Sequence, residues 1–515
     1  MSSQRRQQGG LGRWALLLAL LALALRVLYL LESGENPFRE HLALDPLVYD
    51  QWARSILSGR VLGPDAFPQA PLFPYFVSLC YALFGAAPTA VLWIQTLLGS
   101  ATVFLGAQVA GRLWGRPALL ATGLLLALYK PAIFYTGALL APTLATLLLA
   151  LALWLAVRRG SLRGLGAGLA AGLAGLAHPL VLPGTVVALW GLVRGGTPDG
   201  RPVGSAEATG GQAATRAPQR PARSSREADG TRRNRARPRL LLLLGILLAI
   251  LPATVHNLAM SGAFVPISAN AGVNLQIGNG PQATGFYAAS RRDPNRAQDL
   301  TGLAEAERVT GRELTPAEAS RYWTRQALDA VREDPGRALG LFLRKLYYYL
   351  HAYEAPQIES LDFEKRFSCL LRIPILPNWM LLLALAAGAL VLGWDDRRIR
   401  LLGLAVLATA LATALFFVTG RFRFPMHLLL ALMAGAGIAR AMALRRSAGT
   451  ALRRWVAAVV VVLLTYALLY PNHLAIARDQ TLGQYHHRLG VMAEREGHDA
   501  RARAAYAEAL RLDPR

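Results

Sequence analysis

The chain has 515 residues, of which 54% are hydrophobic, and its Leu and Ala runs exclude an ordinary soluble enzyme. The formal net charge is +24. That charge would also suit a nucleic-acid-binding protein, but in a multi-spanning chain Lys and Arg collect in cytoplasmic loops, so no nucleic-acid partner is expected. Cys80 and Cys369 are the two cysteines, which supports neither a disulfide framework nor a zinc site.

The first apolar segment, residues 14–31, is predicted to be an uncleaved membrane span. Leu, Tyr and Glu residues follow it and no small-x-small cleavage site is visible, which argues against a signal peptide. The preceding tail, MSSQRRQQGGLGR, is basic and therefore predicted to be cytoplasmic. The loop after this span, with LDPLVYDQWARSILSG at residues 44–59, is accordingly expected outside.

Runs of about 17 to 25 mostly apolar residues predict membrane-spanning helices. Eleven such spans are expected, at about residues 14–31, 88–111, 117–133, 142–157, 162–177, 179–193, 239–255, 372–393, 399–418, 424–441 and 453–470. Residues 70–85 are short and proline-broken, and are predicted to form an interfacial helix on the outer face. Counting them as a span would place most later basic clusters outside, against the positive-inside rule. The predicted fold is an all-α polytopic membrane protein whose C-terminus lies outside.

Composition divides the chain into four parts. An N-terminal membrane module (1–193) contains the first outer loop, and a C-terminal membrane module (239–470) contains a large outer loop at 256–370. Residues 194–238 have almost no large apolar side chains and are predicted to be a disordered basic cytoplasmic linker. Within the large outer loop, residues 337–354 alternate apolar and basic side chains with helical spacing, which predicts a helix at the membrane surface.

The tail at residues 471–515 matches the spacing of one 34-residue tetratricopeptide repeat. The matching residues are Leu489, Gly490, Gly497, Ala502, Tyr506, Ala509 and Pro514. A single repeat cannot bury its own apolar face, so we expect it to dock on the membrane domain, self-associate or bind another protein chain. The alternative is an amphipathic helical tail with no partner.

Two carboxylates, Asp45 and Asp50, lie at the start of the first outer loop. An acid beside a bilayer is costly unless it is solvated, paired or used. The local sequence favours a structural role, because Asp followed by Pro is a common helix start with Asp as the N-cap. Asp50, one turn later, suits the helix dipole. A catalytic role depends on the rest of the chain.

Several further stretches lie at the outer ends of predicted spans. They are Asp45, Tyr49, Ala53, Gly59 and the aromatic helix APLFPYF, followed by residues 257–280, residues 322–354 with Lys345 and Glu354, and GRFRFP at 420–425. Their order and sidedness resemble the GT-C superfamily of polyprenyl-phosphate-sugar-dependent glycosyltransferases, which includes protein O-mannosyltransferases and the lipid A aminoarabinose transferase. The resemblance covers most of residues 1–470 and implies a GT-C-like fold.

This resemblance implies an inverting transfer of a sugar from a polyprenyl-phosphate carrier to a hydroxyl of a protein, lipid or polysaccharide. Such a reaction needs a base for the hydroxyl and cations for the leaving phosphate oxygens. The resemblance assigns the base to Asp45. Asp50, the second carboxylate of the loop, is the other candidate catalytic residue. Arg421 and Arg423 suit phosphate recognition, although arginines at a span end also serve as snorkelling anchors. The other expected substrate-binding residues are Tyr49, Lys130, His256, Asn257, Lys345 and Glu354.

The chain differs from many members of this superfamily at two places. The second outer loop, YTGALLAPTLA at 135–145, has no acid, and His256-Asn257 stands where many members have Arg-Asn. We therefore expect no metal and no cofactor beyond the lipid-linked donor, and expect His256 to hold the ligand role of the missing Arg. His178, beside Pro179, is interpreted as a satisfied packing residue.

The predicted location is a bacterial cytoplasmic membrane, with the site on the outer face. Two other functions stay open. A sugar-lipid or polymer transporter predicts charged or broken segments at mid-membrane rather than at the outer rim. A non-catalytic envelope scaffold would use the C-terminal repeat to recruit other proteins.

Overall fold

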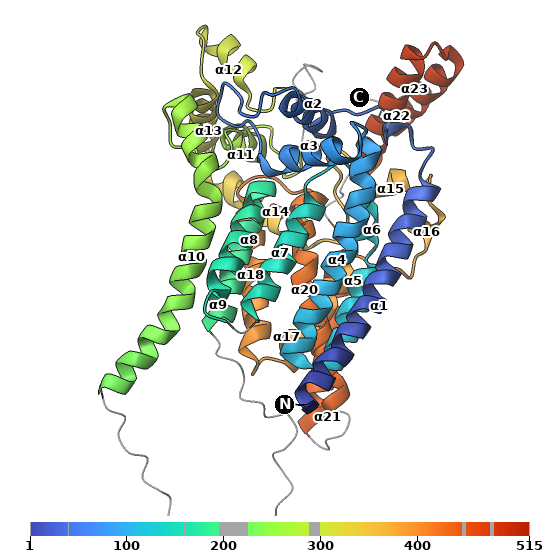
Figure 1. Ribbon diagram of the computed structural model, residues 1–515. Coiled ribbons are helices and arrows are strands. Elements are labelled where there is room, and N and C mark those ends of the chain that lie inside the picture. The colour runs from blue at the N-terminus through green and yellow to red at the C-terminus, as the bar shows by residue number, and fades with distance from the viewer. Residues whose placement is uncertain are drawn as a thin grey trace, which may run out of the picture.

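The computed structural model describes residues 2–39, 41–158, 160–194, 225–287, 299–444, 450–473 and 478–513. The regular secondary structure of these residues is helical, apart from an isolated bridge between Phe286 and Val418. Long helices run side by side through one part of the molecule, and shorter helices gather at one end of them (Figure 1). The helical fold class is as predicted.

The helical bundle occupies every predicted span. Its members are α1 (Ser2–Glu32), α4 (Pro88–Trp114), α5 (Arg116–Leu128), α6 (Lys130–Phe134), α7 (Pro142–Ala156), α8 (Arg163–Ala177), α9 (Leu182–Arg194), α10 (Ser225–Ser261), α17 (Trp379–Leu392), α18 (Arg397–Ala414), α20 (His427–Leu444) and α21 (Thr450–Leu469). α10 begins inside the segment predicted as a loop, and residues 195–224 of that segment lie outside the described residues.

Five described helical segments are long and apolar enough to cross a membrane, which makes this a multi-pass membrane protein. They are Gly10–Glu32, Pro88–Trp114, Arg237–Ser261, Gly420–Leu444 and Leu452–Leu469. The pair α5 and α6, bent by 56° at Tyr129, makes a sixth if it counts as one span. The remaining bundle helices are shorter than the roughly 20 residues that a hydrocarbon core requires, so a total of eleven crossings stays a prediction.

Small residues let some helices of the bundle approach closely. A Cβ atom at Gly164 or Gly168 of α8 would collide with the backbone carbonyls of Pro238 and Leu242 on α10. Close backbone approach through glycine is a common way to pack membrane helices, because lipid gives no hydrophobic driving force between them. The Gly-rich and Ala-rich sequence of α8 therefore serves packing.

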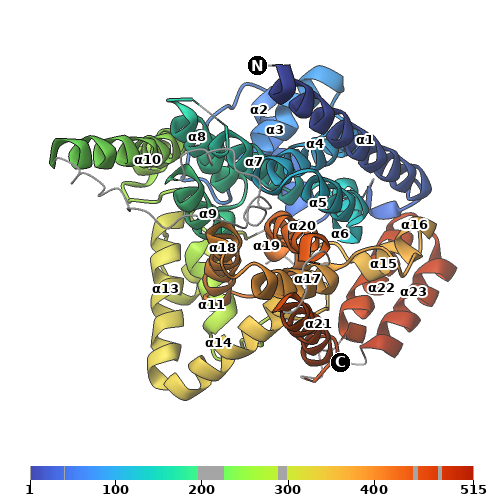
Figure 2. The same ribbon diagram turned by 90° about the horizontal axis from the view of Figure 1, so that it is seen from below.

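One end of the bundle, predicted to face outside and called the outer end below, carries the helices that position the candidate site. They are α2 (Asp45–Leu57), α3 (Leu72–Phe84), α11 (Ala271–Asn279), α12 (Leu303–Thr310), α13 (Pro316–Glu333), α14 (Pro335–Leu350), α15 (Leu361–Glu364) and α16 (Cys369–Arg372). Viewed from below, along the bundle, α13 and α14 are seen lengthwise at its edge (Figure 2). Both therefore lie crosswise to the spans, and α3 and α14 occupy the two segments predicted as surface helices.

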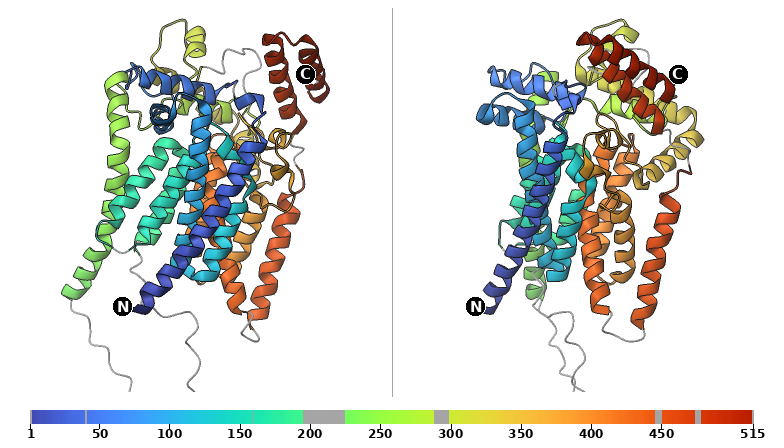
Figure 3. Two further views of the ribbon diagram at one scale, coloured as in Figure 1. Left: turned by 45° about the vertical axis from the view of Figure 1, so that its right-hand side comes forward. Right: turned by 90° about the vertical axis from the view of Figure 1, so that its right-hand side faces the viewer.

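The tail forms a helical hairpin at the outer end, opposite the N-terminus (Figure 3). It consists of α22 (Arg478–Arg495) and α23 (Asp499–Leu512). Gly490 packs on the ring of Tyr506, where a Cβ atom would collide with it. The face of α22 that bears Tyr485 packs against Phe38 and Phe363. This arrangement suits the predicted repeat, docked on the membrane domain.

Candidate functional site

The centre of the candidate site is an ion pair between the first outer loop and a short helix after α18. Asp45, the first residue of α2, accepts a hydrogen bond from Nη1 of Arg421 in α19 (Gly420–Arg423). Its other carboxylate oxygen, Oδ1, accepts a hydrogen bond from Gln69 Nε2 at 3.1 Å. Only 12% of the Asp45 side chain and 14% of the Arg421 side chain are exposed. The carboxylate predicted to be the base and a guanidinium predicted to bind phosphate are therefore in direct contact.

The interpretation of Asp45 as an N-cap is wrong. The N-cap residue of α2 is Leu44, and no side chain caps the helix. Among the described residues other than glycine, Leu44 alone has positive φ, with φ 56° and ψ −136°. Such a conformation costs on the order of 1–3 kcal/mol and persists where the surroundings impose it. The Asp45 carboxylate turns toward Arg421 and Gln69 instead of the helix start.

Arg421 is held from a second direction by the segment that joins α14 to α15. Its Nε donates to Gln357 Oε1 at 2.9 Å.

The ring of Phe422, next to Arg421, meets His178 edge-on, with centroids 5.4 Å apart. His178 is buried, but Nδ1 of its ring has no hydrogen-bond partner in the described structure, so its polar atoms are not all satisfied as the packing interpretation assumed. The side-chain carbonyl oxygen of Gln69, beside Asp45, is likewise buried and unpaired among the described residues.

Two phenols lie near the ion pair. Tyr49, one turn after Asp45, is buried and meets Phe73 edge-on at 5.0 Å between ring centroids. Tyr287 packs against Phe417. Burial raises the pKa of both phenols above the ordinary value; the Asp45 charge adds to this rise and the Arg421 charge opposes it. Both phenols therefore stay protonated and are able to donate hydrogen bonds near Asp45.

The Arg423 side chain lies among backbone carbonyls. Its guanidinium donates to the carbonyl oxygens of Tyr349, His351 and Tyr353, and to Glu354 Oε2 at 2.9 Å. It is 1% exposed and stacks over the Trp379 ring at 4.7 Å. Arg423 and Glu354 were both predicted to be site residues, and the structure joins them in an ion pair. This pair fixes the chain just before Gln357.

Asp50 belongs to a separate cluster on α2 and α3. It accepts hydrogen bonds from Tyr81 Oη at 2.6 Å and Arg54 Nε at 2.9 Å. Arg54 in turn donates to the carbonyl of Ala86, at the end of α3. The Asp50 carboxylate therefore ties α2 to α3, and its two partners are distinct from those of Asp45.

The two predicted lysines also make local contacts. Lys345 is fully buried on α14 and donates to Asn279 Oδ1 at 2.9 Å and the Phe416 carbonyl at 2.8 Å. Burial, with a smaller effect of Arg337, lowers the pKa of Lys345 to about 8. Lys130 begins α6, with its backbone N–H bonded to Pro377 and its side chain near Lys365 and Asp362. Lys345 thus joins α14 to α11 and to the end of α18.

His256 and Asn257 hold the first outer loop against the outer end of α10. The His256 ring packs against Phe67, with the ring centroids 4.3 Å apart, and its Nε2 lies 3.2 Å from the Asp65 carbonyl. Asn257 accepts from the Phe67 N–H and donates to the carbonyls of Val265 and Ile267. Since Phe67 and Gln69 belong to the same loop, these contacts position the partner of Asp45.

The structure therefore brings Asp45, Tyr49 and Arg421 together, and it joins Arg423 and Glu354 in a separate ion pair. Sequence reasoning missed Gln69, Gln357 and Tyr287, because single amide and phenol side chains in long loops carry no motif. Gln69 directly precedes the aromatic helix motif at 70–76, which is the one signal that could have drawn attention to it. Within the described ranges, no group of three or more His, Cys, Asp and Glu residues is suited to hold a metal.

No family model matches the chain, and no curated protein matches it. Among solved structures, the chain is similar to two crystal structures of the Archaeoglobus fulgidus oligosaccharyltransferase, one in complex with Zn and sulfate and one in the apo form. Sequence identity is 15% and 14%, and the TM-score is 0.43 for both. The alignments cover 92% and 93% of this chain but 55% and 58% of those chains, so this chain spans little more than half their length. A likeness at this TM-score carries no argument about activity, and the conclusions below depend on the chain's own residues.

Proposed function

We propose that the protein is an inverting glycosyltransferase that transfers a sugar from a polyprenyl-phosphate carrier to an acceptor hydroxyl at the outer face of a bacterial cytoplasmic membrane. The observation that carries this proposal is the contact of Asp45 with Arg421 at the outer end of the bundle. Transfer from a lipid phosphate requires a base for the acceptor and a cation for the departing phosphate. The pair supplies both groups at the expected level of the lipid headgroup.

In the proposed reaction, the carrier phosphate binds Arg421 through charge-assisted hydrogen bonds. This interaction competes with Asp45 for the guanidinium and releases a carboxylate oxygen. The acceptor hydroxyl then attacks the anomeric carbon from the face opposite the phosphate, and its proton passes to Asp45. The bond between the anomeric carbon and the phosphate oxygen breaks, and its electron pair leaves with polyprenyl phosphate.

The remaining residues have positioning roles in this proposal. Gln69 orients Asp45, and Gln357 orients Arg421, each through one hydrogen bond. Arg423 and Glu354 fix the backbone that carries Gln357, so we assign Arg423 to positioning rather than to direct phosphate contact. Tyr49 and Tyr287 are protonated donors able to contact the sugar or the phosphate.

Transport of a sugar lipid is less well supported. Arg26 of α1 is a buried charged side chain within a described span. The cavity beside it has room for about one water molecule. A sugar does not fit in such a space. The paired charges described above lie at the outer end instead, which favours chemistry at the headgroup level over a path through the bundle.

The direct test is transfer by the purified protein in lipid nanodiscs. Polyprenyl-phosphate sugars of several kinds would be supplied with hydroxyl acceptors, and both free polyprenyl phosphate and the glycosylated acceptor would be measured. We expect equal amounts of the two products and inversion at the anomeric carbon. A well-folded protein that binds acceptors but releases no polyprenyl phosphate from any donor would favour the scaffold function.

A further inference from the structure

Arg26 places a positive charge inside the helical bundle, away from the candidate site. It lies on α1, six residues before the end of the candidate span Gly10–Glu32, and is 1% exposed. Arg is permanently protonated in proteins. A buried charge is normally paired or solvated, since an uncompensated one is strongly destabilising. Arg26 therefore requires a compensating group.

The described chain supplies no such group. No carboxylate in the described ranges forms an ion pair with Arg26, whose guanidinium donates from Nη1 to the Ala22 carbonyl at 3.1 Å. The Nε atom is buried and has no hydrogen-bond partner among the described residues. At least one N–H group of the guanidinium is therefore available to a ligand.

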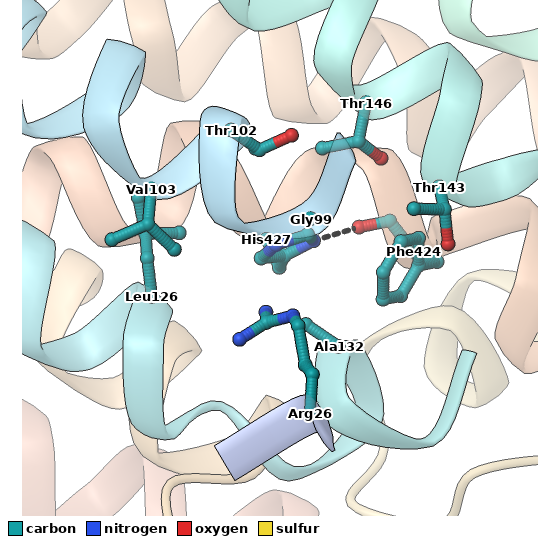
Figure 4. Close-up of a pocket in the computed structure, with 10 residues that line it drawn as sticks. All are labelled: Arg26, Gly99, Thr102, Val103, Leu126, Ala132, Thr143, Thr146, Phe424 and His427. Atoms are coloured by element: carbon teal, nitrogen blue, oxygen red, sulfur yellow. Dashed lines mark hydrogen bonds between the residues drawn. The ribbon is translucent and has the colours of Figure 1, made fainter. Parts of the chain in front are cut away.

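A cavity adjoins this guanidinium. Arg26, Gly99, Thr102, Thr143, Thr146 and His427 are among its lining residues, and Figure 4 shows Arg26 pointing toward His427 with the threonines around them. Gly99 makes room for the charge, because a Cβ atom there would lie 2.6 Å from Arg26 Nε. The remaining space admits about one water-sized particle.

The lining favours an anion over a cation. It contains no carboxylate in the described structure. The proton on His427 Nδ1 is bonded to the Phe424 carbonyl, so the hydrogen-bond donors available to a ligand are those of Arg26 and the threonine hydroxyls. The hydroxyls of Thr102 and Thr146 bond carbonyls one helical turn earlier, at Leu98 and Pro142. Those carbonyls also belong to the helix ladder, so either hydroxyl is able to turn its proton toward the cavity.

We infer that the cavity beside Arg26 binds one small monovalent anion of halide size, such as chloride. The ion neutralises the guanidinium and links α1 to α4, α7 and α20, which together line the site. A water molecule would fill the space but leave the charge uncompensated. This inference is independent of the proposed glycosyltransferase activity.

The test compares thermal unfolding of the full-length protein in nanodiscs after sodium chloride is replaced by sodium gluconate at equal ionic strength. Gluconate is too large for the cavity. We expect chloride and bromide to raise Tm saturably by about 1–3 °C, as ligand binding to the native state requires. Arg26→Met should abolish this dependence, and Arg112→Met, which removes a different charge from α4, should keep it.

Bromide provides a second measurement that needs no variant. Crystals grown in bromide should show an anomalous peak beside Arg26 Nε.

If Arg26→Met does not fold, Gly99→Ala is used instead in the thermal unfolding experiment. The added Cβ displaces the guanidinium, so this variant should weaken the anion dependence of Tm. The inference would be overturned if the wild type had the same Tm in chloride and in gluconate, or if a folded Arg26 or Gly99 variant kept the anion dependence of the wild type. It would also be overturned if the crystals showed a water molecule instead of bromide beside Arg26.

Discussion

Asp45 and Arg421 are 376 residues apart in sequence, yet the carboxylate of one accepts a hydrogen bond from the guanidinium of the other. Both side chains are mostly buried at the outer end of the bundle. Leu44, immediately before Asp45, has an unfavourable backbone conformation that is compatible with this direction of the carboxylate. The predictions below separate the role of this pair from the roles of the charged residues around it.

Arg421 and Arg423 should respond differently to the same substitution. Arg421→Gln removes the guanidinium that is proposed to bind the carrier phosphate. A charged hydrogen bond in a partly desolvated site is worth roughly 1.5 to 3 kcal/mol. The apparent KM for the lipid donor should therefore rise about 10-fold or more, or turnover should be lost, while the protein stays folded. Wild-type donor KM and turnover in Arg421→Gln would reduce Arg421 to a structural partner of Asp45.

Arg423→Gln should act mainly on stability. It removes the donor to three backbone carbonyls and leaves Glu354 without its ion pair. Breaking a buried pair in this way typically costs about 3–5 kcal/mol, so we expect a clear fall in Tm. A variant with unchanged Tm and a raised donor KM would instead return Arg423 to direct phosphate binding.

The C-terminal hairpin should influence the site through the chain between α14 and α15. Tyr485 Oη donates to the Ile358 carbonyl at 2.8 Å, next to Gln357, which holds Arg421. Tyr485→Phe keeps the stacking on Phe363 and should weaken docking by about 0.5–1.5 kcal/mol. We expect faster proteolytic release of the tail and a lower transfer rate.

Tyr506→Phe is the matched control for that experiment. The Tyr506 hydroxyl bonds Glu494 within the hairpin rather than a group of the membrane domain. It should leave the transfer rate unchanged. Equal transfer rates in Tyr485→Phe and wild type would show that the hairpin docks without affecting Arg421.

Glu359 predicts a pH dependence of stability. Burial, with a further contribution from Glu364 against the opposing charges of Arg488 and Arg39, raises the pKa of Glu359 from 4.5 to about 7. Between these two values the folded protein binds more protons than the unfolded chain, so stability falls as pH rises from about 4.5 to about 7. Glu359→Gln should flatten the Tm profile over that window and raise Tm at pH 8. An unchanged profile would contradict this assignment.

Topology is tested by cysteine labelling. The linker at residues 194–238 is predicted to be cytoplasmic and the tail after Pro471 external, from the distribution of Arg. Cys369 is exposed and Cys80 buried, so a Cys369→Ser background gives single reporters when cysteines are introduced at Ser205 and Ala500. Cys369 itself should react from outside in the wild type. Labelling of both introduced cysteines from the same side would refute the count of eleven spans.

Helix positions were largely predictable, because apolar length and proline breaks are properties of local sequence. Whether the shorter helices, such as α8, cross the membrane was not, because their length alone falls below the usual requirement. The sequence also pointed to Asp45 and Arg421 as site residues. It could not reveal their contact, or the parts of Gln69 and Gln357, since hydrogen bonds between loops depend on tertiary packing. For the same reason, the motif spacing around Arg423 did not show that its guanidinium donates to backbone carbonyls.

The most direct test of the proposed function compares Asp45→Asn with Asp50→Asn in the transfer assay, with Tm recorded for each. The Asp45→Asn side chain would keep an oxygen for Arg421 but cannot take the acceptor's proton, so transfer should fall by about 10²-fold or more. Asp50→Asn should change transfer far less, because Asp50 bonds Tyr81 and Arg54 outside the ion pair. Near-normal transfer by a folded Asp45→Asn variant would contradict the role of Asp45 as the base, and with it the proposed mechanism.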